Sequence, residues 1–336
     1  MRHGASTRGQ RPYAGQWMAA PSGGRATFYG SVVQSFAVVD SLDMTPKIVA
    51  SDGVRFRRAG DPNGQPAIFL PAAYWTGAAG LAVARAFHHF SWYLLDLPGT
   101  GGSRPLSRTD ASGLAQWLDA FCERNDIVTP HLVGHSLGGY VALAIAATGQ
   151  PPIRSLLLID GGVAPIGVPQ EMGWMAYAVP VVNATDHLLA GRLITRRPGP
   201  KAPPEVPEDP EVTAHRLRVP LSDALLQAAA DLVAPEGESW NLDSRAVQRL
   251  GLLGVRTWGL RSLKRVKVPT RVLVAMFPGG PQWATTTAMR SLQALRAAGV
   301  DTVGVSTGHY VFWDDAAAFS EVAGPFYSRL IQSAQR

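Results

Sequence analysis

Short apolar runs alternate with amphipathic stretches along the chain from about residue 47 onward. The first two runs flank Asp52-Gly53, a dipeptide typical of hairpin turns. Later runs predict buried strands, and the stretches between them carry apolar residues at helical spacing. The predicted strands are 47–50, 54–58, 67–70, 91–96, 131–134, 155–160, 271–276 and 302–306, and the predicted helices include 80–90, 113–124, 287–298 and 316–331. A leading hairpin followed by β–α alternation predicts an α/β fold with a mostly parallel, eight-stranded sheet flanked by helices.

Two segments depart from this alternation. Residues 1–43 are rich in Gly, Ser, Arg and Gln and contain no acidic residue before Asp40, so we expect a disordered N-terminal extension. Their basic start lacks the compact apolar stretch of a secretory signal, and an alternative is that the natural protein begins at Met44. Residues 162–257 contain helical stretches separated by the proline-rich residues 198–210. The predicted core is therefore 44–161 with 258–336, and 162–257 form a helical insertion after the sixth strand.

Composition narrows the class of protein. With 46 % hydrophobic and 17 % charged residues, the chain can bury a large core. The net charge of +6 comes from scattered basic residues, which do not predict a nucleic-acid surface. Because no apolar run reaches about eighteen residues, we expect no membrane span. The single cysteine, Cys122, predicts a core thiol in a reducing cytoplasm, and the Gly, Ala and Arg content favours a bacterial source.

The candidate chemistry centres on the Gly-His-Ser-Leu-Gly sequence of residues 134–138. A predicted strand ends there, Ser136 stands between small residues, and a helical run begins. In this setting the segment resembles the nucleophile elbow of the α/β-hydrolase family. The resemblance covers Met44 to the C-terminus apart from 162–257, and it includes the loop 96–103, in which we expect Asp96 to order the turn. It implies an α/β-hydrolase fold in which 162–257 form the helical cap.

The same resemblance implies a triad in the chain order nucleophile, acid, histidine. The last predicted strand is followed by His309, which is the expected base. The usual place for the acid, the loop 275–283 after the seventh strand, contains no carboxylate. Asp160 ends the sixth strand and preserves the order, so we assign it as the acid. The alternatives are that Asp160 only orders the turn or that the triad is incomplete, and we expect the neighbouring His135 to face away from the reaction.

Further site residues also follow from the resemblance. The oxyanion hole needs two backbone N–H groups, which we assign to Leu137 and Ala73. Where relatives usually have His-Gly before the second donor, this chain has Pro71-Ala72. We expect Tyr74 and Trp75 to line the substrate pocket or else to pack beneath the cap. Trp174, within the predicted cap, is a further candidate pocket residue, and the alternative is that it packs in the core of the cap.

The resemblance implies a serine hydrolase that cleaves a carboxylic ester, lactone or thioester of a small to medium apolar substrate through an acyl-enzyme, with no cofactor. His187 and His215 are single histidines with no second ligand at metal-ligand spacing, so no metal is predicted. One alternative is a lyase, C–C hydrolase or cyclase that uses the same serine and histidine, and another is a catalytically weak ligand-binding member of the fold. The expected partner is a small molecule rather than a nucleic acid or a membrane, and the sequence does not indicate an oligomeric state.

Overall fold

The computed structural model describes residues 48–51, 53–73, 75–163, 243, 246–247, 249–251, 259–280 and 282–334. The predicted extension 1–43, the two pocket residues Tyr74 and Trp174 and most of the predicted cap lie outside the described residues. The fold is built on one sheet whose strands run in the order β1-β2-β4-β3-β5-β6-β7-β8. The strands are β1 (Ile48–Ser51), β2 (Val54–Gly60), β3 (Pro66–Leu70), β4 (Ser91–Leu95), β5 (His131–His135), β6 (Ser155–Ile159), β7 (Thr270–Ala275) and β8 (Asp301–Val305).

The strand directions agree with the predicted hairpin and crossovers. β2 pairs antiparallel with β1 and with β4, whereas β3 to β8 all pair in parallel. β4, β5 and β6 are buried along their whole length, as expected for parallel strands covered on both faces. The predicted eight-stranded, mostly parallel α/β sheet is confirmed.

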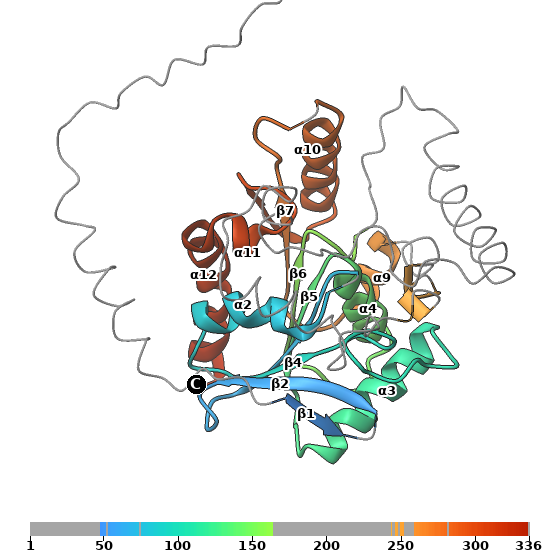
Figure 1. The fold of residues 1–336 in the computed structure, drawn as a ribbon. Helices are drawn as coiled ribbons and strands as arrows, with labels where there is room; N and C mark the ends of the chain where they lie inside the picture. Colours follow the sequence, from blue (N-terminus) through green and yellow to red (C-terminus); the bar gives the residue numbers. More distant parts are fainter. Residues whose placement is uncertain are drawn as a thin grey trace, which may run out of the picture. The chain divides into compact units, whose positions relative to one another are not determined.

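Helices cover both faces of the sheet (Figure 1). One face packs against α2 (Leu81–Ala86), α11 (Val311–Asp314) and α12 (Ala316–Ala334). The other packs against α3 (Ala111–Arg124), α4 (Leu137–Ala146), α9 (Gly259–Arg265) and α10 (Gln282–Ala297). Cys122 lies in this second layer, where burial raises the pKa of its thiol to about 12, so the predicted core thiol is confirmed. No described helix is long and apolar enough to cross a membrane.

Helix boundaries differ from the predicted ones at two places. The predicted helix 80–90 is a 3₁₀ turn (η2, Gly77–Gly80) followed by α2, which ends at Ala86. The next residue, Phe87, has a non-helical backbone, and its carbonyl accepts from the Trp92 indole N–H at 2.8 Å. Helix α10 begins at Gln282 rather than Thr287. Its first turns contain three successive threonines, whose branched side chains have low helix propensity, so the sequence does not reveal this start.

A small part of the predicted insertion is described. Residues 246–247 and 249–251 are helical, and Ala246, Val247 and Leu250 are buried. The Asp243 side chain accepts from the Ala246 N–H at 3.1 Å, and its own N–H donates to the Gly99 carbonyl at 2.7 Å. This segment therefore packs against the loop that follows β4.

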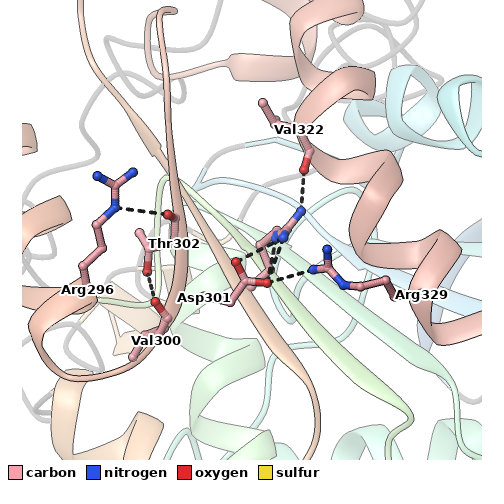
Figure 2. A network of polar contacts seen from close by, with 7 residues as sticks. Arg296, Val300, Asp301, Thr302, Val322 and Arg329 are labelled. Carbon is pink, nitrogen blue, oxygen red and sulfur yellow. Dashed lines mark hydrogen bonds and ion pairs between the residues drawn. The ribbon is translucent and has the colours of Figure 1, made fainter. Parts of the chain in front are cut away.

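An ion-pair cluster ties the last two strands to the C-terminal helix (Figure 2). The Arg271 guanidinium, at the start of β7, donates to both oxygens of Asp301 in β8 at 2.8–3.1 Å. It also donates to the Val322 carbonyl of α12 at 2.7 Å, and Arg329 of the same helix donates to Asp301 at 3.2 Å. The cluster lies at the amino-terminal ends of β7 and β8, opposite the edge where β5 runs into Ser136.

Candidate active site

Ser136 sits at the sharp turn between β5 and α4. Its φ of 51° and ψ of −117° are strained for a residue with a side chain, and such conformations cost about 1–3 kcal/mol. Two hydrogen bonds hold the turn: the Ser136 N–H donates to the Ile159 carbonyl at 3.1 Å, and the Gly138 N–H donates to the Pro71 carbonyl at 2.9 Å. The turn is therefore fixed to the ends of β3 and β6.

The two glycines around Ser136 have a steric reason. A Cβ atom at Gly134 would collide with the Gly138 carbonyl, and one at Gly138 would collide with the Leu70 carbonyl. Both obstacles are backbone atoms, which cannot rotate away. The turn geometry expected from the Gly-x-Ser-x-Gly pattern is thus present, with the partly buried Ser136 at its apex.

Asp160 follows β6 and is held from two sides by β7. It has a positive φ of 41°, its N–H donates to the Leu273 carbonyl at 2.8 Å, and its Oδ1 accepts from the Ala275 N–H at 3.1 Å. These bonds fix the backbone and one carboxyl oxygen. The second oxygen, Oδ2, remains to face His309.

His309 lies in the loop after β8, and its ring forms a hydrogen bond with the Asp160 carboxyl group. The Nδ1 to Oδ2 distance is 2.5 Å, and the side chains of His309 and Asp160 are 36 % and 16 % exposed. Because a carboxylate only accepts hydrogen bonds, Nδ1 donates the hydrogen of this bond. In the neutral ring, the other nitrogen, Nε2, then has a free lone pair.

Ser136 and the His309–Asp160 pair lie at one edge of the sheet. His135 pairs with Ile159 in the β5–β6 register, so the next residues, Ser136 and Asp160, emerge from adjacent strand ends. A Cβ atom at Gly161 would meet the Ser136 backbone, which shows how closely the two turns pack. No hydrogen bond between the Ser136 hydroxyl and His309 is formed among the described residues. Such contacts are often long without substrate and tighten in the substrate complex.

The predicted oxyanion donors flank Ser136 on two elements. Leu137 is the first residue of α4, where the backbone N–H has no partner within the helix and the helix dipole favours negative charge. Ala73 follows Pro71, whose carbonyl accepts from Gly138 at 2.9 Å, so the loop after β3 is bonded to the elbow. Within the described ranges, neither the Leu137 nor the Ala73 N–H has an acceptor.

Trp75 is the one predicted pocket residue that the structure describes. It is 5 % exposed, its indole N–H donates to the Tyr310 hydroxyl at 3.0 Å, and its ring packs edge-on against Tyr310 and Trp313. Trp75 is therefore a core residue that packs against the residues following His309. A contact between Trp75 and substrate stays a prediction.

Two residues that contact the His309 loop were not predicted. Asp314 of α11 accepts from the Gly308 N–H at 2.6 Å, and the His135 ring nitrogen Nε2 lies 2.9 Å from the His309 carbonyl oxygen. His135 is fully buried, and its ring lies against the His309 loop, so the expectation that it faces away from the reaction is wrong. Neither bond has a signal in the sequence, because each depends on how the loop folds back. The buried Asp96 carboxyl accepts from the Gly77 N–H at 2.6 Å, which connects the end of β4 to η2, and its expected role in ordering the loop 96–103 stays a prediction.

Burial sets the charges of the groups beneath the site. The pKa of Tyr140, in the first turns of α4, is raised to about 12 by burial and secondarily by the negative charge of Asp160. The pKa of His135 is lowered far below its usual value by burial and by the nearby His309. Both groups are therefore neutral near pH 7. Among the described residues, no group of three or more His, Cys, Asp and Glu side chains is placed to hold a metal ion.

Comparison with known proteins gives the same picture of the fold. A family model described as "Alpha/beta hydrolase family" matches residues 66–322. Among solved structures, E-2-(acetamidomethylene)succinate hydrolase superposes with a TM-score of 0.60 at 20 % identity, over 84 % of this chain and 98 % of that one. At this identity the likeness shows the fold alone.

Curated relatives match over shorter segments. N-formylmaleamate deformylase from Pseudomonas putida is 32 % identical over 114 residues, 32 % of this chain and 41 % of that protein. Pimeloyl-[acyl-carrier protein] methyl ester esterase from Aeromonas salmonicida is 34 % identical over 125 residues, 36 % and 44 % of the two chains. 2-succinyl-6-hydroxy-2,4-cyclohexadiene-1-carboxylate synthase from Pectobacterium atrosepticum is 29 % identical over 104 residues, 31 % and 41 % of the two chains. This chain thus spans less than half the length of each of these three relatives.

Proposed function

Because the chain belongs to the alpha/beta hydrolase family, we propose that it is a serine hydrolase acting on a carboxylic ester, lactone or thioester through an acyl-enzyme. Ser136 is the nucleophile, His309 the general base and Asp160 the residue that orients His309. The observation that carries the proposal is the 2.5 Å contact between His309 Nδ1 and Asp160 Oδ2, beside a strained serine on the neighbouring strand end. A serine hydroxyl needs such an oriented base to attack near neutral pH.

The proposed reaction has two halves. His309 Nε2 takes the Ser136 proton while Oγ bonds to the substrate carbonyl carbon, and the resulting imidazolium is stabilised by Asp160. His309 then gives this proton to the departing alcohol or thiol, which leaves Ser136 acylated. A water molecule, deprotonated by His309, attacks the acyl carbon; the bond to Ser136 Oγ then breaks, His309 returns the proton to Oγ, and the acid is released.

The negative oxygen of each tetrahedral intermediate is assigned to the backbone N–H groups of Leu137 and Ala73. Preorganised donors of this kind contribute about 3 kcal/mol each. Pro71 has no N–H, but its carbonyl is used by Gly138 and the donor is two residues later, so the proline is compatible with the hole.

The substrate class is proposed from chemistry and similarity together. One relative is named as a methyl ester esterase and another as a deformylase, and both names describe removal of an acyl group. The substrate of this chain is proposed to be apolar and small to medium in size. Cytoplasmic location is proposed from the single buried cysteine.

A second candidate is a lyase or cyclase that uses Ser136 and His309 for proton transfer. The match to 2-succinyl-6-hydroxy-2,4-cyclohexadiene-1-carboxylate synthase favours keeping this alternative. It differs from the first in one respect that can be measured: no acyl group is attached to Ser136 during turnover.

Stopped-flow hydrolysis of p-nitrophenyl esters of increasing acyl length separates the two candidates. The proposed hydrolase gives a burst of p-nitrophenolate equal to the enzyme concentration, followed by slower steady turnover, and Ser136→Ala removes both. A folded wild-type protein that releases no p-nitrophenolate from any ester of the series would favour the second candidate.

A further inference from the structure

His135 joins the nucleophile turn to the loop of the base. It is the last residue of β5 and is covalently attached to Ser136, while its Nε2 lies 2.9 Å from the carbonyl oxygen of His309. The side chain is fully buried, and its ring centroid lies 4.8 Å from that of His309. Rings of Tyr310 and Phe312 pack on it at 5.2 and 5.0 Å. These contacts fix the ring in one orientation.

The partner of Nε2 determines the tautomer of His135. A carbonyl oxygen can only accept, so Nε2 must carry the hydrogen. The other nitrogen, Nδ1, is buried and has no partner among the described residues. A proton on Nδ1 would therefore be a buried donor without an acceptor, next to His309. The neutral form with hydrogen on Nε2 is the one that this environment accommodates.

We propose that His135 is a positioning residue for the reaction: its Nε2–H holds the His309 peptide at a fixed distance from Ser136. The inference rests on the proposed function, because it assigns His135 a role in the Ser136–His309 geometry. Asp160 fixes the His309 ring and Asp314 fixes the preceding peptide N–H. Asp160 is connected to the nucleophile turn through its neighbour Ile159, whose carbonyl accepts from the Ser136 N–H at 3.1 Å. The bond from His135 adds a second connection, and it holds the His309 backbone rather than the His309 ring.

If the proposal is right, the rate of turnover depends on the His135 Nε2–H donor. A displacement of about 1 Å between reacting groups can cost 10²-fold in rate. Because His135 does not touch substrate, its loss changes kcat and leaves KM nearly unchanged.

The test compares His135→Gln with His135→Met. The two side chains have similar length and flexibility, and only glutamine has an N–H at its end. We expect His135→Met to lower kcat for p-nitrophenyl esters by about 10- to 100-fold. His135→Gln should recover most of this loss, with KM within about threefold of wild type in both. Equal kcat values in the two variants would overturn the inference.

The same substitutions at His131 provide a matched control. His131 is also fully buried in β5, at the opposite edge of the sheet, where it contacts Ser155 and Gln65 at 2.8 and 3.0 Å. We expect His131→Gln and His131→Met to lower stability while their kcat values stay equal to each other. If His131→Gln and His131→Met differed in kcat as much as the two variants at position 135, the comparison would reflect side-chain packing in β5 and not the His135 hydrogen bond.

A measurement on the wild-type protein covers the case in which His135→Met does not fold. ¹⁵N NMR of the labelled imidazoles near pH 7 should show His135 as the neutral Nε2–H tautomer. The Nδ1–H tautomer or a charged ring would overturn the inference. This result is independent of activity, so a wild type without ester turnover contradicts the proposed function, whereas the wrong tautomer contradicts the positioning bond.

Discussion

At the scale of single residues, three of the five described non-glycine residues with positive φ lie at the carboxyl edge of the sheet. Ser136, Asp160 and Phe277 follow β5, β6 and β7, and all three have positive φ values. Ser136 was predictable because its turn requires glycines at fixed positions. Asp160 was assigned because the usual acid is missing, which is a weaker reason. Phe277 was not predicted, since its backbone is set by a hydrogen bond to the Thr307 carbonyl at 2.9 Å, far along the chain.

The role of Asp160 is tested by Asp160→Asn. The asparagine can still accept from the Ala275 N–H, but its amide then donates toward His309 Nδ1. The ring would take the tautomer with hydrogen on Nε2, which cannot accept the Ser136 proton. We expect kcat for p-nitrophenyl esters to fall by about 10²- to 10⁴-fold. An unchanged kcat would show that Asp160 is not part of the triad. Asp301→Asn, at the opposite edge of the sheet, is the control and should leave kcat unchanged.

At the scale of elements, strands were easier to predict than helix ends or loops. All eight strands were visible in the sequence: β4 and β6 are continuous apolar runs, and β2 has apolar Val54 and Phe56 alternating with arginines. The four-residue helix α11 has no periodicity that a sequence can show, and yet its Asp314 fixes the Gly308 N–H. The elements that complete the site are thus short and are held by contacts between distant residues, which no local pattern contains.

Arg271 makes the central contacts at the junction of β7, β8 and α12. Its side chain is 8 % exposed and makes a two-pronged bond to Asp301 and a further bond to Val322. We expect Arg271→Met to lower the free energy of unfolding in urea by about 1–3 kcal/mol, because the partly buried Val322 carbonyl loses its donor and the Asp301 carboxylate keeps only Arg329. Its kcat should be unchanged, since the cluster lies away from Ser136.

The matched control is Arg329→Met. The Arg329 and Asp301 side chains are 59 % and 40 % exposed, and exposed ion pairs contribute about 0–1 kcal/mol. If Arg329→Met destabilises the protein as much as Arg271→Met, the junction is not organised by Arg271.

At the scale of the whole molecule, the two edges of the sheet carry different groups of residues. The carboxyl ends of β5 and β6 present Ser136 and Asp160, while the amino ends hold buried polar clusters around His131 and Arg271. The parallel sheet and this functional edge followed from the order of predicted strands, because ligands of open α/β sheets bind at the carboxyl ends. The clusters at the other edge did not, since their partners are far apart in sequence.

His131 predicts how stability depends on pH. Burial, Arg154 and His89 lower the pKa of His131 to about 4 in the folded protein, against 6.5 as the usual value. Above pH 6.5 the ring is neutral in both states. Below it the unfolded chain binds a proton that the folded chain does not, so the free energy of unfolding falls by about 1.4 kcal/mol per pH unit until pH 4. Buried His135 acts in the same direction.

Urea unfolding followed by circular dichroism at pH 7, 6 and 5 measures this dependence. We expect His131→Gln to be less stable than wild type at pH 7 and to lose less stability on acidification. Parallel pH profiles for the two proteins would show that His131 does not carry the effect.

The central claim is that Ser136 is a nucleophile activated by His309 and Asp160. A fluorophosphonate probe tests it most directly, because it reacts with an activated serine without requiring the natural substrate. Intact-mass spectrometry should show one probe per chain, peptide mapping should place it on Ser136, and Ser136→Ala should remain unlabelled while folded. A folded wild type that takes up no probe, or a probe attached elsewhere, would contradict the claim.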